Sequence, residues 1–197
     1  MRTKICGITN LEDALDAIKA GVNALGFVFY PPSPRYITPE DARKIAESLP
    51  PFVQLVGLFV NENPHTINES CKTAKMDIAQ IIIEDESKEY FEAISVKYVK
   101  VLRAQSKEDI QKYKNQYVLV DAFVPGFGGE GKRVALEWFE DIDCSFMILA
   151  GGLNESNLKE LKGFDFYGVD VSSGVELTKG KKDKNKMNNF VKAANEI

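Results

Sequence analysis

Two glycine-containing turns near the C-terminal end of the chain have the residue types that cradle a phosphate. The turns 150–153 and 168–174 each accompany a short apolar run and lie one strand-and-helix unit apart. Glycine lets backbone N–H groups approach a dianion closely, and the start of a helix favours negative charge. Either turn alone fits an ordinary left-handed turn, but together they predict a small phosphorylated ligand. The candidate phosphate-binding residues are Gly151, Gly152, Asp170, Ser172, Ser173 and Gly174.

A proton-transfer reaction in this chain would depend on a cysteine and a carboxylate. The single histidine, His65, follows an Asn-Pro pair at the start of a predicted helix, where a surface or capping role is expected. Cys6 ends the first apolar run, and a thiol near helix N-termini and cations has a lowered pKa and can act as a base. Asp121 ends the sixth run, where apolar walls raise the pKa of a carboxyl so that it can act as an acid. The inert alternatives are a buried structural cysteine and a capping aspartate.

Arg35 is presented by a stiff, extended segment. The prolines within 31–34 fix the backbone and exclude helix before them. A planar guanidinium matches a carboxylate, so we expect Arg35 to bind a carboxylate of the substrate. A proline-rich ligand for a partner domain is the alternative, which a position inside a folded unit disfavours.

The glycine-rich segment 126–133 matches a dinucleotide-binding pattern and most of a phosphate-binding loop. The first match lacks an acidic residue at the end of the next strand, and the second has Arg133 where a magnesium-binding hydroxyl is needed. We interpret the segment as a lid with glycines Gly128, Gly129 and Gly131, because such loops close over active sites. The basic run 179–184 has no interleaved aromatic residues, so we expect a solvated loop and no nucleic-acid binding.

Eight short apolar runs alternate with amphipathic segments and would position these residues. Runs that are apolar on both faces are typical of parallel strands buried between a barrel interior and outer helices. The expected strands are 4–6, 24–29, 53–60, 78–83, 98–102, 118–121, 146–150 and 166–171. The expected helices are 11–20 with Asn10 as its N-cap, 39–48, 64–73, 87–94, 107–114, 136–142, 155–162 and 183–195. We therefore predict an α/β fold, a (β/α)₈ TIM barrel, with a flavodoxin-like open sheet as the alternative.

Length and composition restrict the class of protein. A chain of 197 residues with 44% hydrophobic residues predicts one domain over residues 1–197, and the net charge of −4 argues against general attraction to nucleic acid or membranes. Three widely spaced cysteines, with neither a signal segment nor a membrane-spanning run, predict a cytoplasmic protein without disulfides or a metal site. We expect a monomer or weak homodimer.

In a barrel the active-site residues lie at the C-terminal strand ends. The polar residues at these ends are Cys6, Arg35, Asn61, Glu84, Arg103, Asp121 and Asp170.

The order and spacing of these motifs resemble the phosphoribosylanthranilate isomerase family over nearly the whole chain. The motifs that carry the resemblance are 4–9, 26–29 with 33–35, 56–61, Asp121 with 128–131, 150–153, 168–176 and 180–183. The resemblance implies a (β/α)₈ barrel that isomerises N-(5-phosphoribosyl)anthranilate by an Amadori rearrangement without a cofactor. It further implies that Cys6 is the base, Asp121 the acid and Arg35 the partner of the anthranilate carboxylate.

The chain departs from the family pattern in two places. Residues 80–83 read Gln-Ile-Ile-Ile where the family has Gln-Leu-His-Gly, and Glu130 stands where the lid has a small hydroxyl residue. The family pattern therefore does not predict the substrate affinity or the lid closure of this chain. Neither departure affects the catalytic pair Cys6 and Asp121. The alternatives are indole-glycerol-phosphate synthase, a histidine-pathway isomerase, a noncatalytic binding protein and a nucleotide-binding protein.

Overall fold

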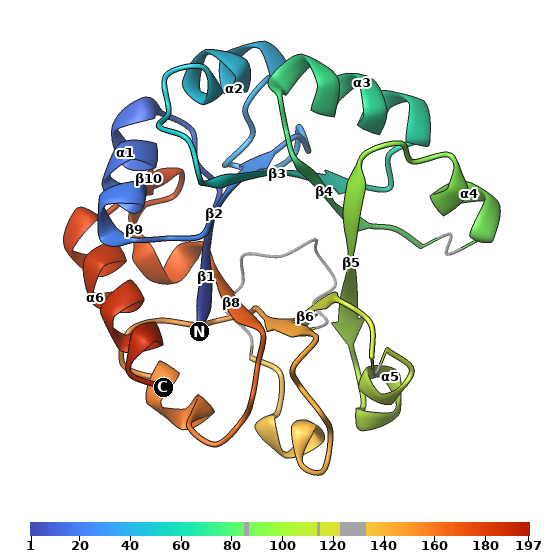
Figure 1. Cartoon of the computed structure of the whole chain (residues 1–197), viewed down its shortest axis with the longest axis vertical. Helices are drawn as coiled ribbons and strands as arrows, with labels where there is room; N and C mark the ends of the chain where they lie inside the picture. Colours follow the sequence, from blue (N-terminus) through green and yellow to red (C-terminus); the bar gives the residue numbers. More distant parts are fainter. Residues whose placement is uncertain (85–86, 114, 123–132) are drawn as a thin grey trace.

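A computed structural model gives the fold, and it describes residues 1–84, 87–113, 115–122 and 133–197. Eight parallel strands form a closed barrel in which each strand pairs with the next along the chain and the last pairs with the first. In Figure 1 the strands make an inner ring and the helices lie outside it. The strands are β1 (Arg2–Cys6), β2 (Ala24–Val28), β3 (Gln54–Val60), β4 (Ile78–Ile82), β5 (Lys97–Ala104), β6 (Val118–Ala122), β7 (Met147–Leu149) and β8 (Gly168–Val171).

The closed ring confirms the predicted (β/α)₈ barrel and excludes the open-sheet alternative. The lid glycines Gly128, Gly129 and Gly131 lie outside the described residues. Within the described part of the chain, no helix combines the length and apolar character needed to cross a bilayer. The α-helices are α1 (Leu11–Ala20), α2 (Pro39–Ala46), α3 (Pro64–Ala74), α4 (Lys88–Glu92), α5 (Lys107–Gln111) and α6 (Lys184–Asn195).

Local signals set the bounds of the first helix. The Asn10 side chain accepts a hydrogen bond from the Asp13 backbone N–H at 2.9 Å, which confirms the predicted N-cap. Gly21 ends the helix with φ of 97°, a left-handed conformation that glycine adopts without steric cost. Both signals lie next to the helix in the sequence, so α1 begins and ends where the sequence predicts.

The two helices predicted after β6, where the sequence offers only a short one, and after β7 are wrong in type. Short 3-10 helices replace them at Leu136–Phe139 and Leu158–Leu161. In the second case, the Asn157 side chain accepts from the Asn154 N–H at 2.9 Å and donates to the Gly152 carbonyl at 2.9 Å. Asparagine side chains that bond nearby backbone groups compete with an α-helix, and here they tie the segment to the loop after β7.

A small antiparallel hairpin follows β8 and was not predicted. Its strands are β9 (Glu176–Thr178) and β10 (Lys181–Lys182), and Gly180 makes the turn with φ of 82°. The expectation of a solvated loop over 179–184 is therefore wrong, because Lys182 is buried. The hairpin lies beside α1 and contacts the loop after β1, at the side of the barrel where the chain closes on itself (Figure 1).

Candidate active site

The two faces of the barrel strands have different surroundings. Ile5 of β1 and Leu25 of β2 are fully buried and belong to the same apolar cluster as Ala14 of α1, so they point outward toward the helices. Successive side chains of a strand alternate between faces. Lys4 and Cys6 of β1 therefore point into the barrel.

The register between neighbouring strands identifies the inward-facing residues of the other strands. Lys4 lies opposite Asp170 of β8, and Arg103 of β5 lies opposite Asp121 of β6. Neighbours in register share a face, and following the pairs from β1 through β8 to β6 places Asp121 on the inner face. The side chains of Cys6, Asp121 and Asp170 thus enter the barrel from the C-terminal halves of three strands, as active-site residues of this fold do.

An ion pair lies beside Cys6 inside the barrel. Lys4 Nζ contacts Asp170 Oδ1 at 2.9 Å, and both side chains are almost fully buried. An added Cβ on Gly26 would come within 2.8 Å of Cys6 Sγ and 2.9 Å of Lys4 Nζ, so the thiol and the ammonium lie against the same point of β2. Because Gly26 has no side chain, it leaves the room that the side chains of Cys6 and Lys4 occupy.

Burial raises the pKa of the Cys6 thiol above its ordinary value, and the positive charges of Lys4 and Lys182 oppose that shift only in part. The expectation of a lowered pKa is therefore wrong for this structure. The reason is that Cys6 is 5% exposed, so removal of the thiolate from water outweighs its attraction to nearby cations.

The expectation of a raised pKa for Asp121 is confirmed. Burial raises the pKa of this carboxyl to about 6, and the hydrogen bond from the Ala122 N–H opposes the shift. The negative charge of Asp170 raises it further, whereas Arg103 lowers it. An aspartate with this pKa keeps an appreciable protonated fraction near neutral pH, which is the property that a general acid needs.

Arg35 lies near Cys6 but is held by a carboxylate of the chain itself. Its Nε and Nη2 atoms donate to the two oxygens of Glu176 at 2.7 and 2.8 Å, and the pair is buried. Gly7 leaves room for this arrangement, because an added Cβ there would lie 2.5 Å from Arg35 Cδ. The bidentate pair fixes the guanidinium plane and leaves Nη1 outside the pair. Its predicted contact with a substrate carboxylate stays a prediction.

The two glycine-containing turns meet at the mouth of the barrel. Gly151 and Gly152 have φ of 87° and 62°, and the loop after β8 continues into a 3-10 turn at Ser173–Val175. An added Cβ on Gly174 would overlap the Leu153 carbonyl oxygen, so the loops after β7 and β8 are in direct backbone contact. Asp170 differs from the other predicted phosphate ligands, because its carboxylate accepts from Lys4 inside the barrel and carries the same sign of charge as a phosphate.

We expect Gly174→Ala to lower the free energy of unfolding by about 1–3 kcal/mol, because the methyl group forces the two loops apart. Urea unfolding monitored by circular dichroism measures this change. Ser173→Ala removes only the hydroxyl of an exposed side chain in the same loop and serves as the control. Equal stabilities of the two variants would contradict the close contact between the loops.

Two other polar residues at strand ends contact each other. Asn61 accepts a hydrogen bond from the Glu84 N–H at 3.2 Å at an exposed site, and His65 is exposed in the first turn of α3. The described residues contain no group of three or more histidine, cysteine, aspartate or glutamate side chains arranged to hold a metal ion.

Sequence reasoning missed four buried charged residues: Lys4, Glu176 and Lys182 at the candidate site, and Asp13 in α1. The spacing of Lys4 two residues before Cys6 signals a shared strand face, but nothing near Glu176 or Lys182 in the sequence signals their burial. Gln80, two residues before Ile82 at the place of the family histidine, points into the barrel. Its Oε1 has no hydrogen-bond partner among the described residues.

Comparisons with known proteins agree with this geometry. The sequence profile of N-(5'-phosphoribosyl)anthranilate (PRA) isomerase matches residues 3–193. An N-(5'-phosphoribosyl)anthranilate isomerase from a Nitratiruptor species is 58% identical over 194 residues, which cover 98% of each chain. The crystal structure of phosphoribosyl anthranilate isomerase from Thermus thermophilus has a TM-score of 0.87 at 35% identity, covering 100% of this chain and 99% of that one.

A third similar protein was crystallised with a bound ligand. The crystal structure of a phosphoribosyl anthranilate isomerase in complex with reduced 1-(o-carboxyphenylamino)-1-deoxyribulose 5-phosphate has a TM-score of 0.85 at 37% identity. The comparison covers 100% of each chain. The ligand of that protein contains a carboxylate at one end and a phosphate at the other, the two groups that the sequence predicts for this chain.

Proposed function

The chain belongs to the N-(5'-phosphoribosyl)anthranilate isomerase family and is an isomerase of tryptophan biosynthesis, and we propose that it acts by an Amadori rearrangement with Cys6 as base and Asp121 as acid. One observation carries the proposal. A buried thiol and a carboxyl of raised pKa both enter the same barrel interior near the C-terminal strand ends.

The reaction needs two proton transfers. Protonated Asp121 donates its proton to the ribose ring oxygen, the bond from C1 to that oxygen breaks, and a protonated Schiff base forms between C1 and the anthranilate nitrogen. The Cys6 thiolate then removes the proton from C2, and the electron pair forms the C1–C2 double bond of an enolamine. Tautomerisation gives the C2 ketone. C2 is oxidised as C1 is reduced within one molecule, so the electrons balance without an external oxidant.

Binding groups at the two ends of the substrate hold it for both transfers. We assign the anthranilate carboxylate to Arg35, and the phosphate to the backbone N–H groups of Gly151, Gly152, Ser173 and Gly174 with the Ser172 hydroxyl beside them. The ligand in the related crystal structure carries both a carboxylate and a phosphate, which supports a phosphorylated substrate for this chain. Anchoring far from the reacting carbons lowers the entropic part of the barrier, because both proton-transfer partners are then fixed in place.

The Lys4–Asp170 pair supports the same assignment. The Lys4 ammonium lies near the Cys6 thiol and stabilises its negative charge when the thiolate forms. Asp170 keeps the ammonium in place, although its own negative charge raises the pKa of Cys6. The negative charge of Asp170 in turn favours the protonated form of Asp121. One buried carboxylate therefore interacts with both members of the proposed acid–base pair.

The direct test mixes purified protein with enzymatically generated phosphoribosylanthranilate and follows the fluorescence of the substrate. We expect decay of the fluorescence at a rate proportional to the protein concentration. A noncatalytic binding protein would leave the fluorescence constant apart from spontaneous hydrolysis. Such a result would contradict the proposal, and growth of a tryptophan auxotroph that expresses the chain provides an independent check.

We expect kcat/KM to rise about tenfold per pH unit up to about pH 6 and then to stay level until it falls above the raised pKa of Cys6. Activity requires protonated Asp121 together with the Cys6 thiolate. Above pH 6 the first fraction falls as fast as the second rises, so their product is constant. A steady tenfold loss per unit between about pH 6 and 8 would show that Cys6 is already ionised there and would contradict this assignment.

A further inference from the structure

A buried lysine lies behind the loop that we assign to the phosphate. The Lys182 side chain on β10 is 0% exposed. Its Nζ donates to Glu176 Oε1 at 3.0 Å, to the Ser172 carbonyl at 3.2 Å and to Ser172 Oγ at 3.3 Å. These three contacts match the three N–H donors of an ammonium group, so Lys182 is fully engaged in holding the loop after β8.

The Ser172 carbonyl accepts from Lys182 at 3.2 Å and from the Val175 N–H at 3.4 Å, and these contacts orient the whole peptide group. In a planar trans peptide, the carbonyl and the N–H of the next residue point in opposite directions. With the Ser172 oxygen turned toward Lys182 and the hairpin, the Ser173 N–H is turned away from them. Ser173 is exposed, so a ligand can reach this side of the loop, and there we place the proposed phosphate.

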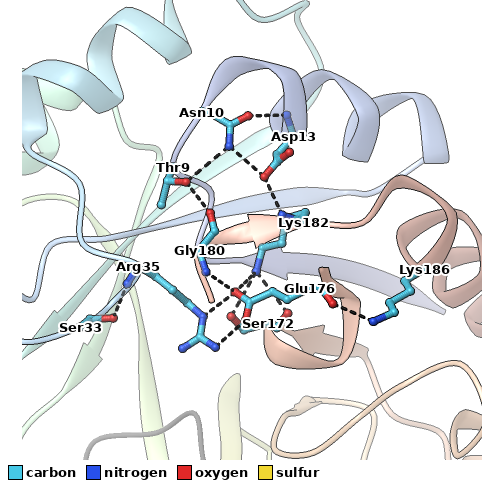
Figure 2. A network of polar contacts seen from close by, with 10 residues as sticks. All are labelled: Thr9, Asn10, Asp13, Ser33, Arg35, Ser172, Glu176, Gly180, Lys182 and Lys186. Atoms are coloured by element: carbon cyan, nitrogen blue, oxygen red, sulfur yellow. Dashed lines mark hydrogen bonds and ion pairs between the residues drawn. The ribbon is translucent and has the colours of Figure 1, made fainter. Parts of the chain in front are cut away.

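Glu176 connects Lys182 to the other end of the proposed substrate site. Its carboxylate accepts from Lys182, from the Gly180 N–H at 3.2 Å and from two nitrogens of Arg35. Figure 2 shows this carboxylate between the Arg35 guanidinium and the Lys182 ammonium. Burial lowers the pKa of Lys182, whereas the charge of Glu176 raises it. With Lys182 in its ammonium form two cations share one anion, and the positive charge in excess favours a nearby anion.

The hairpin that bears both residues is itself tied down. Thr9 Oγ1 donates to the Gly180 carbonyl at 2.6 Å, and Asp13 Oδ2 accepts from the Lys182 backbone N–H at 2.7 Å (Figure 2). An added Cβ on Gly180 would lie 3.1 Å from the carbonyl oxygen of Pro34, so the hairpin turn also packs against the segment before Arg35. The hairpin therefore bridges the loops after β1, β2 and β8.

We propose that Lys182 is a positioning residue that turns the Ser173 N–H toward the substrate phosphate, and that Glu176 couples this phosphate contact to the guanidinium of Arg35. The inference rests on the proposed function, whose phosphate and carboxylate sites it connects. Neither residue touches the reacting carbons in this scheme. Each acts through a group that binds one end of the substrate.

The test uses inorganic phosphate and anthranilate as competitive inhibitors. Phosphate reports on the proposed phosphate site, and anthranilate reports on the proposed carboxylate site. For Lys182→Met we expect the inhibition constant of phosphate to rise on the order of 10-fold to 100-fold, the effect of losing one hydrogen bond to a charged group. KM rises in parallel, and kcat changes less. The inhibition constant of anthranilate stays within about threefold, because Glu176 still holds Arg35 in both of its hydrogen bonds.

For Glu176→Gln we expect the inhibition constants of both probes to rise. Lys181→Met is the matched control, because Lys181 lies on the same strand but pairs with Glu12 and Asp13 at the edge of the hairpin. We expect the control to leave both constants unchanged. An unchanged phosphate constant in Lys182→Met, an equal rise for both probes in that variant, or a rise for only one probe in Glu176→Gln would overturn the proposal.

A measurement on the unmodified protein covers the case in which the variants fail to fold. In a phosphate titration followed by amide NMR, we expect the Ser173 N–H resonance to shift downfield and to saturate with the binding curve. Phosphate binding without a response of this amide would overturn the inference. The proposed function is tested apart from it, since absence of turnover in the unmodified protein refutes the isomerase mechanism but leaves the phosphate titration informative.

Discussion

Cys6→Ala is expected to lower kcat by about 10²-fold to 10⁴-fold, the usual contribution of a positioned general base. Alanine has no group that can take the C2 proton, and no other thiol of the chain can replace it. Because the two binding ends of the proposed substrate site are untouched, we expect KM to change little. Steady-state kinetics by the fluorescence assay measures both constants.

The chain provides two matched controls for this variant. Cys71 in α3 and Cys144 before β7 are also buried free cysteines. Burial raises the pKa of Cys71 to about 12 and that of Cys144 to about 11, and neither lies on the inner face of a barrel strand. Their alanine variants should keep kcat within about twofold. A Cys6→Ala variant with kcat within about tenfold of the unmodified protein would remove Cys6 from the mechanism.

Asp121→Asn is expected to reduce kcat by a similar factor of about 10²-fold to 10⁴-fold, because an amide cannot donate a proton to the ring oxygen. The change is nearly isosteric, and the Asn oxygen can still accept the hydrogen bond from the Ala122 N–H. The pH profile gives a second readout. The residual kcat/KM should rise steadily with pH toward the pKa of Cys6, without the level region that starts at about pH 6 in the unmodified protein.

The same variant should be more stable than the unmodified protein at neutral pH. The pKa of Asp121 is raised in the folded state, so the stability that this group contributes is present below its ordinary pKa of 3.8 and is lost as pH rises through about 6. Asparagine avoids that loss, which amounts to at most about 3 kcal/mol. Thermal unfolding at about pH 4 and about pH 7 should show the difference only at the higher pH. Equal stability at neutral pH would contradict the raised pKa.

The barrel itself was predictable because its determinants are local. Most strand runs are predominantly apolar, and several are followed by residues that begin or end a helix, such as Asn10 and Gly21 around α1. The 3-10 segments after β6 and β7 were not predictable in type. Their helical periodicity is present in the sequence, but in the second of them side-chain hydrogen bonds from Asn157 to a neighbouring loop decide the backbone conformation.

The candidate site was likewise predictable only in part. Cys6, Asp121 and the two glycine-containing turns follow strand runs directly, so strand alternation and strand ends place them at the mouth. The partner of Arg35 is 141 positions away in the sequence, and Lys182 looks like one of several surface lysines. Only closure of the ring brings β9 and β10 against the loop after β2 and buries these charges together.

The sequence by itself determined the eight-fold alternation, the family and the positions of the thiol and the carboxyl, because these depend on periodicity and on residues adjacent in the chain. Tertiary structure alone decided the ionisation of Cys6, the pairing of Lys4 with Asp170, and the network of Arg35, Glu176 and Lys182. The physical reason is that burial and charge–charge distance control a pKa, and both are fixed only when strands distant in sequence become neighbours.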